Sequence, residues 1–575
     1  MKNRTVLIVA LILFSVRSIG QTYISNVTVV DVDKQKLVPH QTVIIKDDLI
    51  TGIQSSSKAK IPAGADVIDG AGKYLMPGLT DAHVHFFQSG GLYARPDAID
   101  LRKDAPYKQE ITWAHNNMED FLRRYTMLGI TSVIDVGSTI HFLQQRDTFV
   151  NKNYAPAIYM TGPLLTSYEP DEYFNLKNDE PFFLVKTPDE GVKYVQQQLP
   201  YHPDFIKIWY IAESAEAAKK FEPTAKAIID EAHRNNLKVA VHATERLTAQ
   251  LAVESGCDYL VHEVEDEIVS DNFVKLLKTK KVILCPTLTV ADNYDFTFAQ
   301  EYKYSAYDLI NSNPVTIGSL TDLRHLPDSA IISRYKTHFS SNAVKHISSR
   351  TDSVRMVNLK KMSDAGVIIV AGTDAGNIGT QHASSLLSEL KAMKASGMST
   401  WQVIRSATIN SAKIFDSEKS EGSIAVGKTA NAVLLNANPI DALDNLKDIE
   451  LVINRGAIFH PYSLIAETPV TIVEHQLNAY NMGNIDAFLA SYSDDIELYD
   501  FPSKLSGKGK EDMRKDYQNS FTTFPGLHCE ILERIVQGNV IIDKEKVTGV
   551  GPVPLIGTVI YEINNNKISK VYFIN

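Results

Sequence analysis

The sequence contains little cysteine: three residues, Cys257, Cys285 and Cys529, in a chain of 575. Thiols so few and so widely spaced exclude a disulfide framework. Apolar residues make up 44% and charged residues 22% of the chain, which excludes a disordered, collagen-like or multi-spanning membrane protein. Basic charge is not in excess either, since 58 Lys and Arg against 68 Asp and Glu give a net charge of −10, which argues against a nucleic-acid-binding surface. At roughly 150 residues per domain, the length predicts three to four domains.

A single long apolar run stands at the N-terminus. Lys2 and Arg4 precede the run at 5–16 (TVLIVALILFSV), and the small residues Ser18 and Gly20, at the −3 and −1 positions, offer a cleavage site. The pattern predicts a cleaved signal peptide over residues 1–20 and therefore an exported, periplasmic or secreted protein without a stable membrane anchor. An uncleaved anchor is the less favoured alternative, because the run is shorter than the ~20 residues of a membrane-spanning helix.

The mature chain changes its pattern twice. Residues 21–75 carry short β-branched runs between turn residues, typical of small antiparallel strands. From 76 to 419 buried-strand candidates alternate with amphipathic helical patterns, which favours a (β/α)8 TIM-like barrel over an open doubly wound sheet. The eight candidates are 78–86, 131–137, 156–162, 204–210, 237–243, 259–264, 281–290 and 366–375. Residues 420–462 return to β-type runs, so both flanks are predicted to form one small β-sandwich domain beside the barrel.

Residues 468–575 form a separate unit in the pattern. Thr468 suits a helix N-cap and Pro469 the first helical turn, and apolar residues follow at helical spacing. Strand-like runs then alternate with hairpin signals at 537–539 and 564–566. Helices followed by a meander of strands predict an independent α+β domain.

Four histidines and one aspartate fall where predicted barrel strands end. His83 and His85 are two residues apart on the first strand and share a face, while His242, His262 and Asp374 lie near the ends of the fifth, sixth and eighth strands. The C-terminal ends of barrel strands converge on one mouth, and imidazole and carboxylate are ligands that zinc-like ions prefer. Any one of these residues alone would more often be a hydrogen-bonded core residue, but together they predict a metal centre.

Lys207 stands in an apolar strand, FIKIW. A buried ammonium without a partner is costly, so one interpretation is a lysine that reaches the barrel rim. The alternative is a neutral amine, its pKa lowered by burial and neighbouring cations, that adds CO2. The carbamate so formed is a carboxylate on a long stem, suited to bridge two metal ions.

The order of these residues resembles the amidohydrolase superfamily, in particular its binuclear prolidase-like and imidazolonepropionase-related branch. The likeness spans roughly residues 23 to 460. It rests on PGLTDAHVH (77–85), Lys207, His242, His262 and GTDAG (372–376). The chain differs from many relatives at Glu263, where they have glycine. The resemblance implies the barrel, the flanking β-domain and metal-dependent hydrolysis.

Ligand roles follow from the resemblance. It implies two divalent metal ions, expected to be zinc. It also implies that Asp374 takes a proton from water and delivers it to the leaving amine. The more buried ion would be held by His83, His85 and Asp374, the more exposed ion by His242 and His262, and carbamylated Lys207 would bridge the two. His382, in a loop after the eighth strand, is a candidate substrate contact, with a solvated loop residue as the equal alternative.

The C-terminal unit resembles the nuclear-transport-factor-2-like or SnoaL-like cone fold. The likeness rests on residues 473–475, 484–488 and 571–573. Tyr499, Asp500 and His528 are candidates for lining its pocket. Because this fold hosts isomerases, cyclases, binders and dimerisation modules, we expect a non-catalytic role in assembly or ligand holding.

These observations predict an exported binuclear amidohydrolase. Its substrate would be a small molecule with an amide or peptide-like C–N bond: a dipeptide, an N-acyl amino acid or a cyclic amide. A lactonase or phosphotriesterase at the same metal site is one alternative. The others are an isomerase or cyclase in the C-terminal domain and an exported binding protein without turnover. A homo-oligomer stays open.

Overall fold

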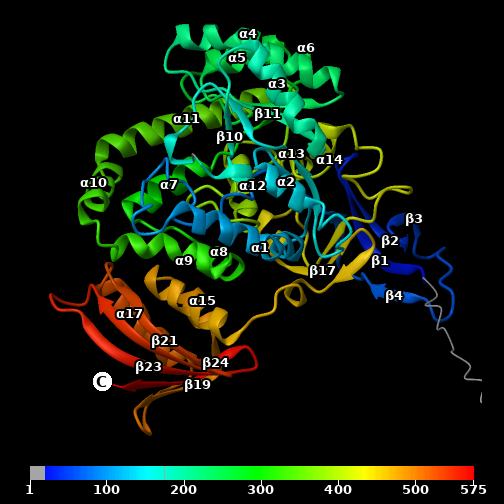
Figure 1. Cartoon of the computed structure of the whole chain (residues 1–575). Helices are drawn as coiled ribbons and strands as arrows, with labels where there is room; N and C mark the ends of the chain where they lie inside the picture. Colours follow the sequence, from blue (N-terminus) through cyan, green and yellow to red (C-terminus); the bar gives the residue numbers. More distant parts are fainter. Residues whose placement is uncertain (1–19, 174, 575) are drawn as a thin grey trace, which may run out of the picture.

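The computed structural model describes residues 20–173 and 175–574. The predicted signal peptide, residues 1–20, therefore lies almost wholly outside the described residues. A barrel with its covering helices forms the body of the molecule, a β-sheet flanks it, and the C-terminal domain packs below it (Figure 1). Within the described ranges, no helix has the length and apolar character needed to cross a membrane.

The barrel consists of parallel strands at all eight predicted positions. Their bounds are β6 (Leu79–Val84), β7 (Ile130–Asp135), β8 (Ala157–Met160) continued by β9 (Leu164–Thr166), β11 (Phe205–Trp209), β12 (Lys238–His242), β13 (Tyr259–Val261), β14 (Ile283–Cys285) and β15 (Ile368–Ile369). Strands β6, β7 and β8 pair in one parallel sheet, and β9 pairs with β11, which leads on through β12, β13 and β14 to β15. The Ala82 N–H donates to the Ala371 carbonyl at 2.9 Å and the His85 N–H to that of Ala375 at 2.8 Å, which joins the first strand to the last. A short strand, β10 (Phe182–Leu184), pairs with β9 at the edge.

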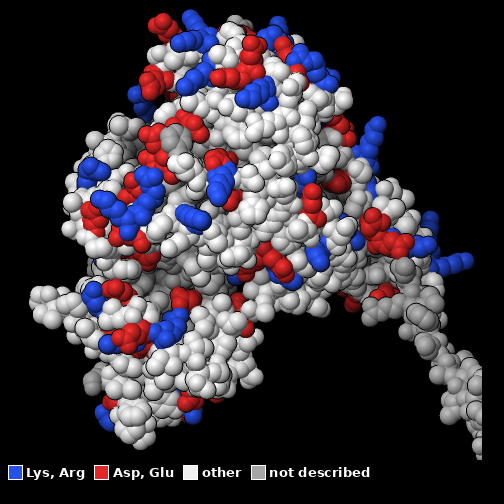
Figure 2. Space-filling model, in the orientation of Figure 1, with Lys and Arg blue, Asp and Glu red and all other residues white. Residues whose placement is uncertain are grey.

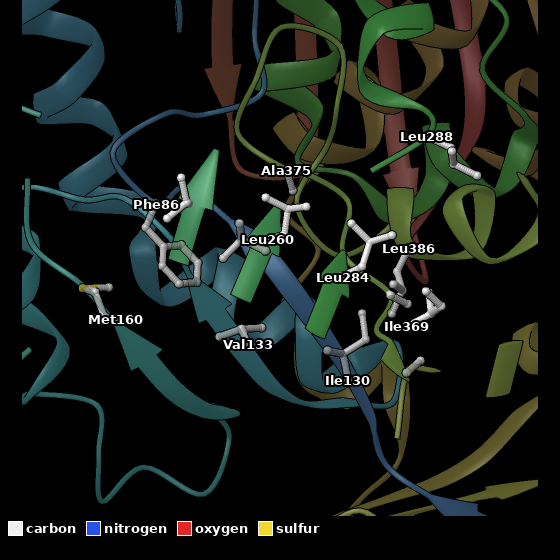
Figure 3. Close-up of a cluster of buried hydrophobic side chains, with 14 of the residues drawn as sticks. Phe86, Ile130, Val133, Met160, Leu260, Leu284, Leu288, Ile369, Ala375 and Leu386 are labelled. Carbon is white, nitrogen blue, oxygen red and sulfur yellow. The ribbon is translucent and has the colours of Figure 1, made fainter. Parts of the chain in front are cut away.

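Branched and aliphatic side chains fill the space around these strands (Figure 3). Val133, Leu260 and Leu284 are each at most 1% exposed and come from three different strands. The seventh strand is shorter than the predicted 281–290. It ends at Cys285, because Pro286 has no N–H for the ladder and Thr287 turns the backbone to φ 46°.

Helices surround the barrel. They are α1 (Tyr107–Met127), α2 (Ile140–Arg146), α3 (Pro188–Gln198), α4 (Ala215–Arg234), α5 (Arg246–Ser255), α6 (Asp271–Lys280), α11 (Asn342–Asp364), α12 (Ser385–Ala395), α13 (Thr400–Ser406) and α14 (Ile409–Ala412). Short 3-10 turns complete the set: η1 (Asp171–Tyr173), η2 (Lys177–Asp179), η3 (Leu199–Tyr201), η4 (Leu320–Arg324), η5 (Lys413–Phe415), η6 (Leu443–Lys447) and η7 (Pro461–Ser463). Four helices between β14 and α11 were not predicted from the sequence: α7 (Val290–Ala299), α8 (Ala306–Asn311), α9 (Pro314–Ser319) and α10 (Ser329–Phe339).

Strands from both flanks of the barrel join in one eight-stranded sheet. The N-terminal strands are β1 (Thr22–Asp31), β2 (Lys36–Lys46), β3 (Leu49–Ser55), β4 (Asp66–Asp69) and β5 (Tyr74–Pro77). The C-terminal strands are β16 (Ala432–Leu435), β17 (Ile449–Asn454) and β18 (Ala457–Phe459). Antiparallel pairing of β5 with β16 connects the two groups. The boundaries predicted for the separate domains stay predictions.

The C-terminal domain is a six-stranded sheet with three helices. Its elements are α15 (Pro469–Asn481), α16 (Ile485–Ala490), β19 (Tyr492–Asp500), β20 (Lys504–Lys508), α17 (Lys510–Thr523), β21 (His528–Gln537), β22 (Val540–Thr548), β23 (Leu555–Asn564) and β24 (Lys567–Ile574). As predicted, Thr468 caps α15: its hydroxyl accepts the Thr471 N–H at 3.1 Å. Helix α15 lies between the sheet and the inserted helices α8 and α9 (Figure 1). The Asn478 side chain of α15 donates to the Pro314 carbonyl at 2.7 Å.

Acidic and basic side chains are interspersed on the face of the molecule shown in Figure 2. Apolar residues of the inserted helices and of the C-terminal domain belong to one buried cluster, in which Ile317 of α9 and Ile472 of α15 are at most 4% exposed. The C-terminal domain is therefore docked on the inserted helices through a shared core.

Candidate metal centre

All six predicted metal ligands line one cavity of about 400 Å³. They are His83 and His85 at the end of β6, Lys207 in β11, His242 at the end of β12, His262 after β13 and Asp374 after β15. Parallel strands bring their carboxyl ends to the same face of the barrel, which is why residues so distant in sequence meet here.

His83, His85 and Asp374 form the tightest group. The Nε2 atoms of the two imidazoles lie 3.3 Å apart. Each lies 3.1 Å from Oδ1 of Asp374. Despite this proximity, Asp374 Oδ1 accepts no hydrogen bond of good geometry from any described residue. Burial would raise the pKa of Asp374, but the neighbouring His83 and His85 rings hold it well below its usual range. Three ligand atoms therefore converge on one point.

Lys207, His242 and His262 line the same cavity. The ring centroids of His242 and His262 lie 4.4 Å apart, and that of His262 lies 4.9 Å from the ring of His83. These two histidines do not join the group formed by His83, His85 and Asp374, whose ligand atoms all lie within 4.8 Å of one another. Lys207 is 1% exposed, and burial lowers its pKa to about 7. A lysine reaching the solvent at the rim, the first interpretation of its sequence position, is therefore wrong.

Three residues at the cavity have left-handed backbones. The φ angles are 75° at His262, 46° at Thr287 and 62° at Asp374. Non-glycine residues in this region cost on the order of 1–3 kcal/mol each, and they persist only where the surrounding structure holds them. A contact between two of these residues helps to hold them: His262 Nδ1 lies 2.7 Å from the Thr287 hydroxyl. Thr287 was not predicted, because the contact joins two strand ends that the sequence does not relate.

Two buried carboxylates also escaped the sequence analysis. Asp81 accepts the Thr373 N–H at 3.0 Å and its hydroxyl at 2.7 Å, and thereby fixes the loop that carries Asp374. Asp135 accepts the N–H groups of Phe86 and Gly137, each at 3.1 Å. Burial raises the pKa of both carboxyls to about 7. A charged residue inside each of two buried strands was the available signal for these supports.

His382 does not lie in the cavity. Its Nδ1 is 3.0 Å from the Tyr125 hydroxyl, and its Nε2 is 2.9 Å from the Gln88 carbonyl oxygen. The ring packs against Phe86 and Phe121, with centroids 5.4 and 4.3 Å away. Both nitrogens are therefore engaged behind the cavity wall, which gives no support to a substrate contact.

The three candidates in the C-terminal domain are not brought together. Its own cavity, about 440 Å³, is lined by other residues, among them Tyr480, Tyr517 and Glu545. His528 instead faces the barrel, and its Nε2 lies 2.9 Å from Nδ1 of His325.

The wall of the barrel cavity combines apolar and charged side chains. Leu164, Phe182 and Trp209 supply apolar surface, and the rings of Phe182 and Trp209 stack with centroids 5.0 Å apart. Arg95 enters the wall in a bidentate pair with Asp97, with N···O distances of 2.8 and 2.6 Å. Arg95 and Asp97 belong to the loop after β6, and their sequence context carried no signal.

Glu263 and Arg355 complete the wall. They are 1% and 5% exposed, and within the described ranges neither Oε2 of Glu263 nor Nε of Arg355 has a hydrogen-bond partner. Burial raises the pKa of Glu263 well above its usual range. Polar atoms left unsatisfied when buried are costly.

The sequence matches the amidohydrolase family over residues 74–459 of its 575. The chain belongs to the amidohydrolase family. A second match, to the SnoaL-like domain, covers residues 473–571. Both resemblances seen in the sequence are thus confirmed, and the amidohydrolase match contains every one of the six residues around the cavity.

One characterised relative of this amidohydrolase is the enamidase of Eubacterium barkeri. The two are 25% identical over 241 residues, which is 40% of this chain and 53% of the enamidase. The alignment thus spans about half the length of that relative.

Solved amidohydrolase structures share the fold. A Xaa-Pro dipeptidase with bound methionine superposes with a TM-score of 0.57 at 21% identity, over 77% of this chain and 100% of its own. Molinate hydrolase gives 0.58 at 19% identity over 78% and 96%, and ochratoxinase of A. niger 0.57 at 16% over 77% and 96%. At these identities the likeness shows the fold alone.

The residues of the cavity fit a divalent metal ion. Two imidazole Nε2 atoms and a carboxylate oxygen point at one another, and that oxygen lacks a donor. Nitrogen and oxygen ligands in this combination suit zinc and similar ions. His83, His85 and Asp374 could hold one ion, and Lys207, His242 and His262 could take part in a second.

Proposed function

We propose that this amidohydrolase is an exported, binuclear metal-dependent enzyme that cleaves an amide or peptide-like C–N bond in a small molecule. The observation that carries the proposal is the convergence of the six predicted ligands on one cavity. Export rests on the N-terminal sequence pattern alone. The second ion, its identity as zinc and the carbamate on Lys207 are parts of the proposal.

Bound divalent ions would supply Lewis acidity toward the scissile carbonyl and lower the pKa of water. The carboxylate of Asp374 takes the proton that water loses as its oxygen attacks the carbonyl carbon. The same carboxylate returns this proton to the nitrogen that leaves when the C–N bond breaks. Asp81, through Thr373, holds the loop of Asp374 in place for both transfers.

The cavity wall supports a substrate of the dipeptide or N-acyl amino acid type. Phe182 and Trp209 offer apolar surface, and the charged side chains Arg95, Glu263 and Arg355 are also part of the lining. Such a wall is complementary to a molecule that carries both an apolar side chain and hydrogen-bonding groups. The name of one solved relative, a Xaa-Pro dipeptidase, agrees with this class.

A substrate panel combined with metal analysis tests the proposal. The purified protein, loaded with zinc in bicarbonate buffer, is assayed with dipeptides, N-acyl amino acids and cyclic amides, and in parallel with lactones and phosphotriesters. We expect hydrolysis of C–N substrates and roughly two ions bound in the barrel cavity of each chain. Faster turnover of lactones or phosphotriesters would instead establish the alternative hydrolase.

Matched variants separate the two domains. Asp374→Asn is expected to abolish hydrolysis and Glu545→Gln, in the cavity of the C-terminal domain, to leave it intact. The opposite pattern would place the chemistry in the SnoaL-like domain, as an isomerase or cyclase. Metal binding without turnover of any panel member would favour a binding protein.

A further inference from the structure

A second cluster of two imidazoles and one carboxylate lies outside the barrel cavity. Helices α1 and α2 lie near each other on the barrel surface (Figure 1), where Gln145 of α2 donates to the His115 carbonyl of α1, and the turn η2 packs against α2. They contribute His115, His141 and Asp179, whose ligand atoms all lie within 4.8 Å of one another. The cluster shares no residue with the catalytic cavity. We propose that it is a second cation site, which binds a zinc-like divalent ion.

The contacts of His115 indicate that a proton or a metal ion lies between its Nε2 atom and Asp179. The amide of Gln145 donates from Nε2 to the His115 carbonyl at 2.9 Å, so its oxygen faces His115 Nδ1, 2.6 Å away. An amide oxygen only accepts, and therefore Nδ1 carries the hydrogen. In the neutral ring the lone pair is then on Nε2, which lies 2.8 Å from Oδ1 of Asp179. Two acceptors at this distance need a proton or a metal ion between them.

The other contacts place and orient the ligands. His141 Nδ1 lies 3.4 Å from Oδ2 of Asp179, and its side chain is 53% exposed, so an ion can enter from solvent. The Thr139 hydroxyl donates to Oδ1 of Asp179 at 3.1 Å. The ring of His115 stacks on Phe142 with centroids 3.6 Å apart. Outer partners of this kind are what hold metal ligands in a defined orientation.

A simple ion pair on the same protein offers a comparison. His233 Nε2 lies 2.8 Å from Oδ2 of Asp258, the same separation as in the cluster, but no second imidazole joins it among the described residues. Two imidazoles and a carboxylate make three ligands, with further positions open to water, a set that suits zinc. One imidazole and one carboxylate do not.

The ion would tie a wall of the catalytic cavity to the outer helices. Turn η2 lies between η1 and β10, and Phe182 of β10 lines that cavity. Tyr173 of η1 donates to Oδ1 of Asp97, which holds Arg95 in the cavity wall. Binding at Asp179 would therefore stabilise the segment from which these contacts arise.

The test measures zinc bound per chain in the full-length protein, after equilibration with zinc and removal of the excess. His141→Ala is compared with the wild type and with His233→Ala, a matched loss of an imidazole that pairs with one carboxylate. We expect His141→Ala to bind one ion fewer than both. His83→Ala should lose zinc from the barrel and keep this ion, so that the site is scored independently of the proposed catalysis.

Restoring a ligand at position 141 distinguishes loss of the zinc site from general damage to the protein. His141→Glu, which restores a ligand, should recover the missing ion, and Asp179→Asn should lose it. Zinc should also raise the Tm of a His83→Ala protein, and this rise should vanish when His141→Ala is added. Equal zinc content in His141→Ala and His233→Ala, with both proteins folded by circular dichroism, would overturn the proposal and leave a protonated His115–Asp179 ion pair.

Discussion

Nδ1 of His85 lies 2.7 Å from the carbonyl oxygen of Gly137. Because a carbonyl only accepts, Nδ1 carries the hydrogen and the lone pair of the neutral ring is on Nε2, which faces His83 and Asp374. The backbone of the barrel thus presets His85 as a ligand before any ion arrives. The lone pair of His85 Nε2 then faces the Asp374 carboxylate oxygen, 3.1 Å away, and a cation between the two would relieve this contact.

Metal removal should therefore destabilise the fold. An ion whose free concentration is a thousand times its Kd adds about 4 kcal/mol to the free energy of unfolding. We expect a chelator to lower the Tm of the wild type and to have a much smaller effect on His85→Ala. Calorimetric scans with and without chelator measure this, and an equal chelator shift in both proteins would show that His85 holds no ion.

Lys207→Ala should lose both metal and hydrolysis. If the lysine acts as a carboxylate on a stem, its removal leaves a hole into which acetate or formate fits, and either anion should restore part of both properties. Methylamine should not. Titration of metal content and rate against each additive checks the prediction. Full metal and full activity without additive would exclude the bridging role.

Thr287→Val should weaken metal binding by about 10–100-fold, as is typical when a partner of a ligating histidine is lost. Valine keeps the β-branched shape present at this left-handed position and replaces the hydroxyl that His262 Nδ1 contacts with a methyl group, which cannot form a hydrogen bond. Thr279→Val, on the exposed side of α6, is the control. Competition with a chelating dye gives both affinities, and equal values would show that the contact does not orient His262.

The barrel and its six cavity residues were predictable because each depends on a local pattern. Short apolar runs alternating with helices give the strands, and a histidine or lysine in such a run is conspicuous. The supports of the site were not predictable, because they are contacts between distant segments, as between Asp81 and Thr373. His382 shows the same limit: its position after the last strand was correct, but the direction of its side chain depends on Phe86 and Phe121.

Two of the four inserted helices, α8 and α9, were missed for a different reason. Helices α8 and α9 have six residues each, too short for a periodic pattern, and much of what stabilises them is packing against α15. That contact comes from a part of the chain more than 150 residues away, as in the hydrogen bond from Asn478 to Pro314. Long elements with a local pattern can thus be predicted from the sequence, whereas short helices stabilised by distant contacts cannot.

Asp322, in the cavity between barrel and C-terminal domain, should make stability depend on pH. Burial raises its pKa to about 6, although the Tyr93 hydroxyl donates to it at 2.8 Å. The folded protein then holds a proton that the unfolded chain releases above about pH 4. Stability is therefore lost as the pH rises from about 4 to 6, and the loss persists above that range.

Asp322→Asn removes this penalty, and the amide oxygen can still accept from Tyr93. One pKa unit corresponds to about 1.4 kcal/mol, and the side chain is 27% exposed, so we expect a gain of about 1–2 kcal/mol at pH 8 and little at pH 4. Urea unfolding at both pH values measures it, with the exposed Asp66→Asn as control. A gain that is the same at both pH values would not come from this titration.

Gly318 of α9 sits directly against the C-terminal domain. A Cβ at this position would meet Oδ1 of Asn478 at 2.5 Å, and Nδ2 of the same amide donates to the Pro314 carbonyl at 2.7 Å. Gly318→Ala must therefore either shift α9 against α15 or turn the Asn478 amide away from Pro314, at a cost of about 1–3 kcal/mol for overpacking. At Gly526 an added Cβ meets nothing within 4 Å, which makes Gly526→Ala the control.

Because the two domains share one buried cluster, the Tm of the whole chain should fall in Gly318→Ala alone, while hydrolysis at low temperature persists. A second, lower transition for the C-terminal domain with an unchanged barrel transition would contradict the shared core, since it would mean that the barrel does not depend on its neighbour for stability.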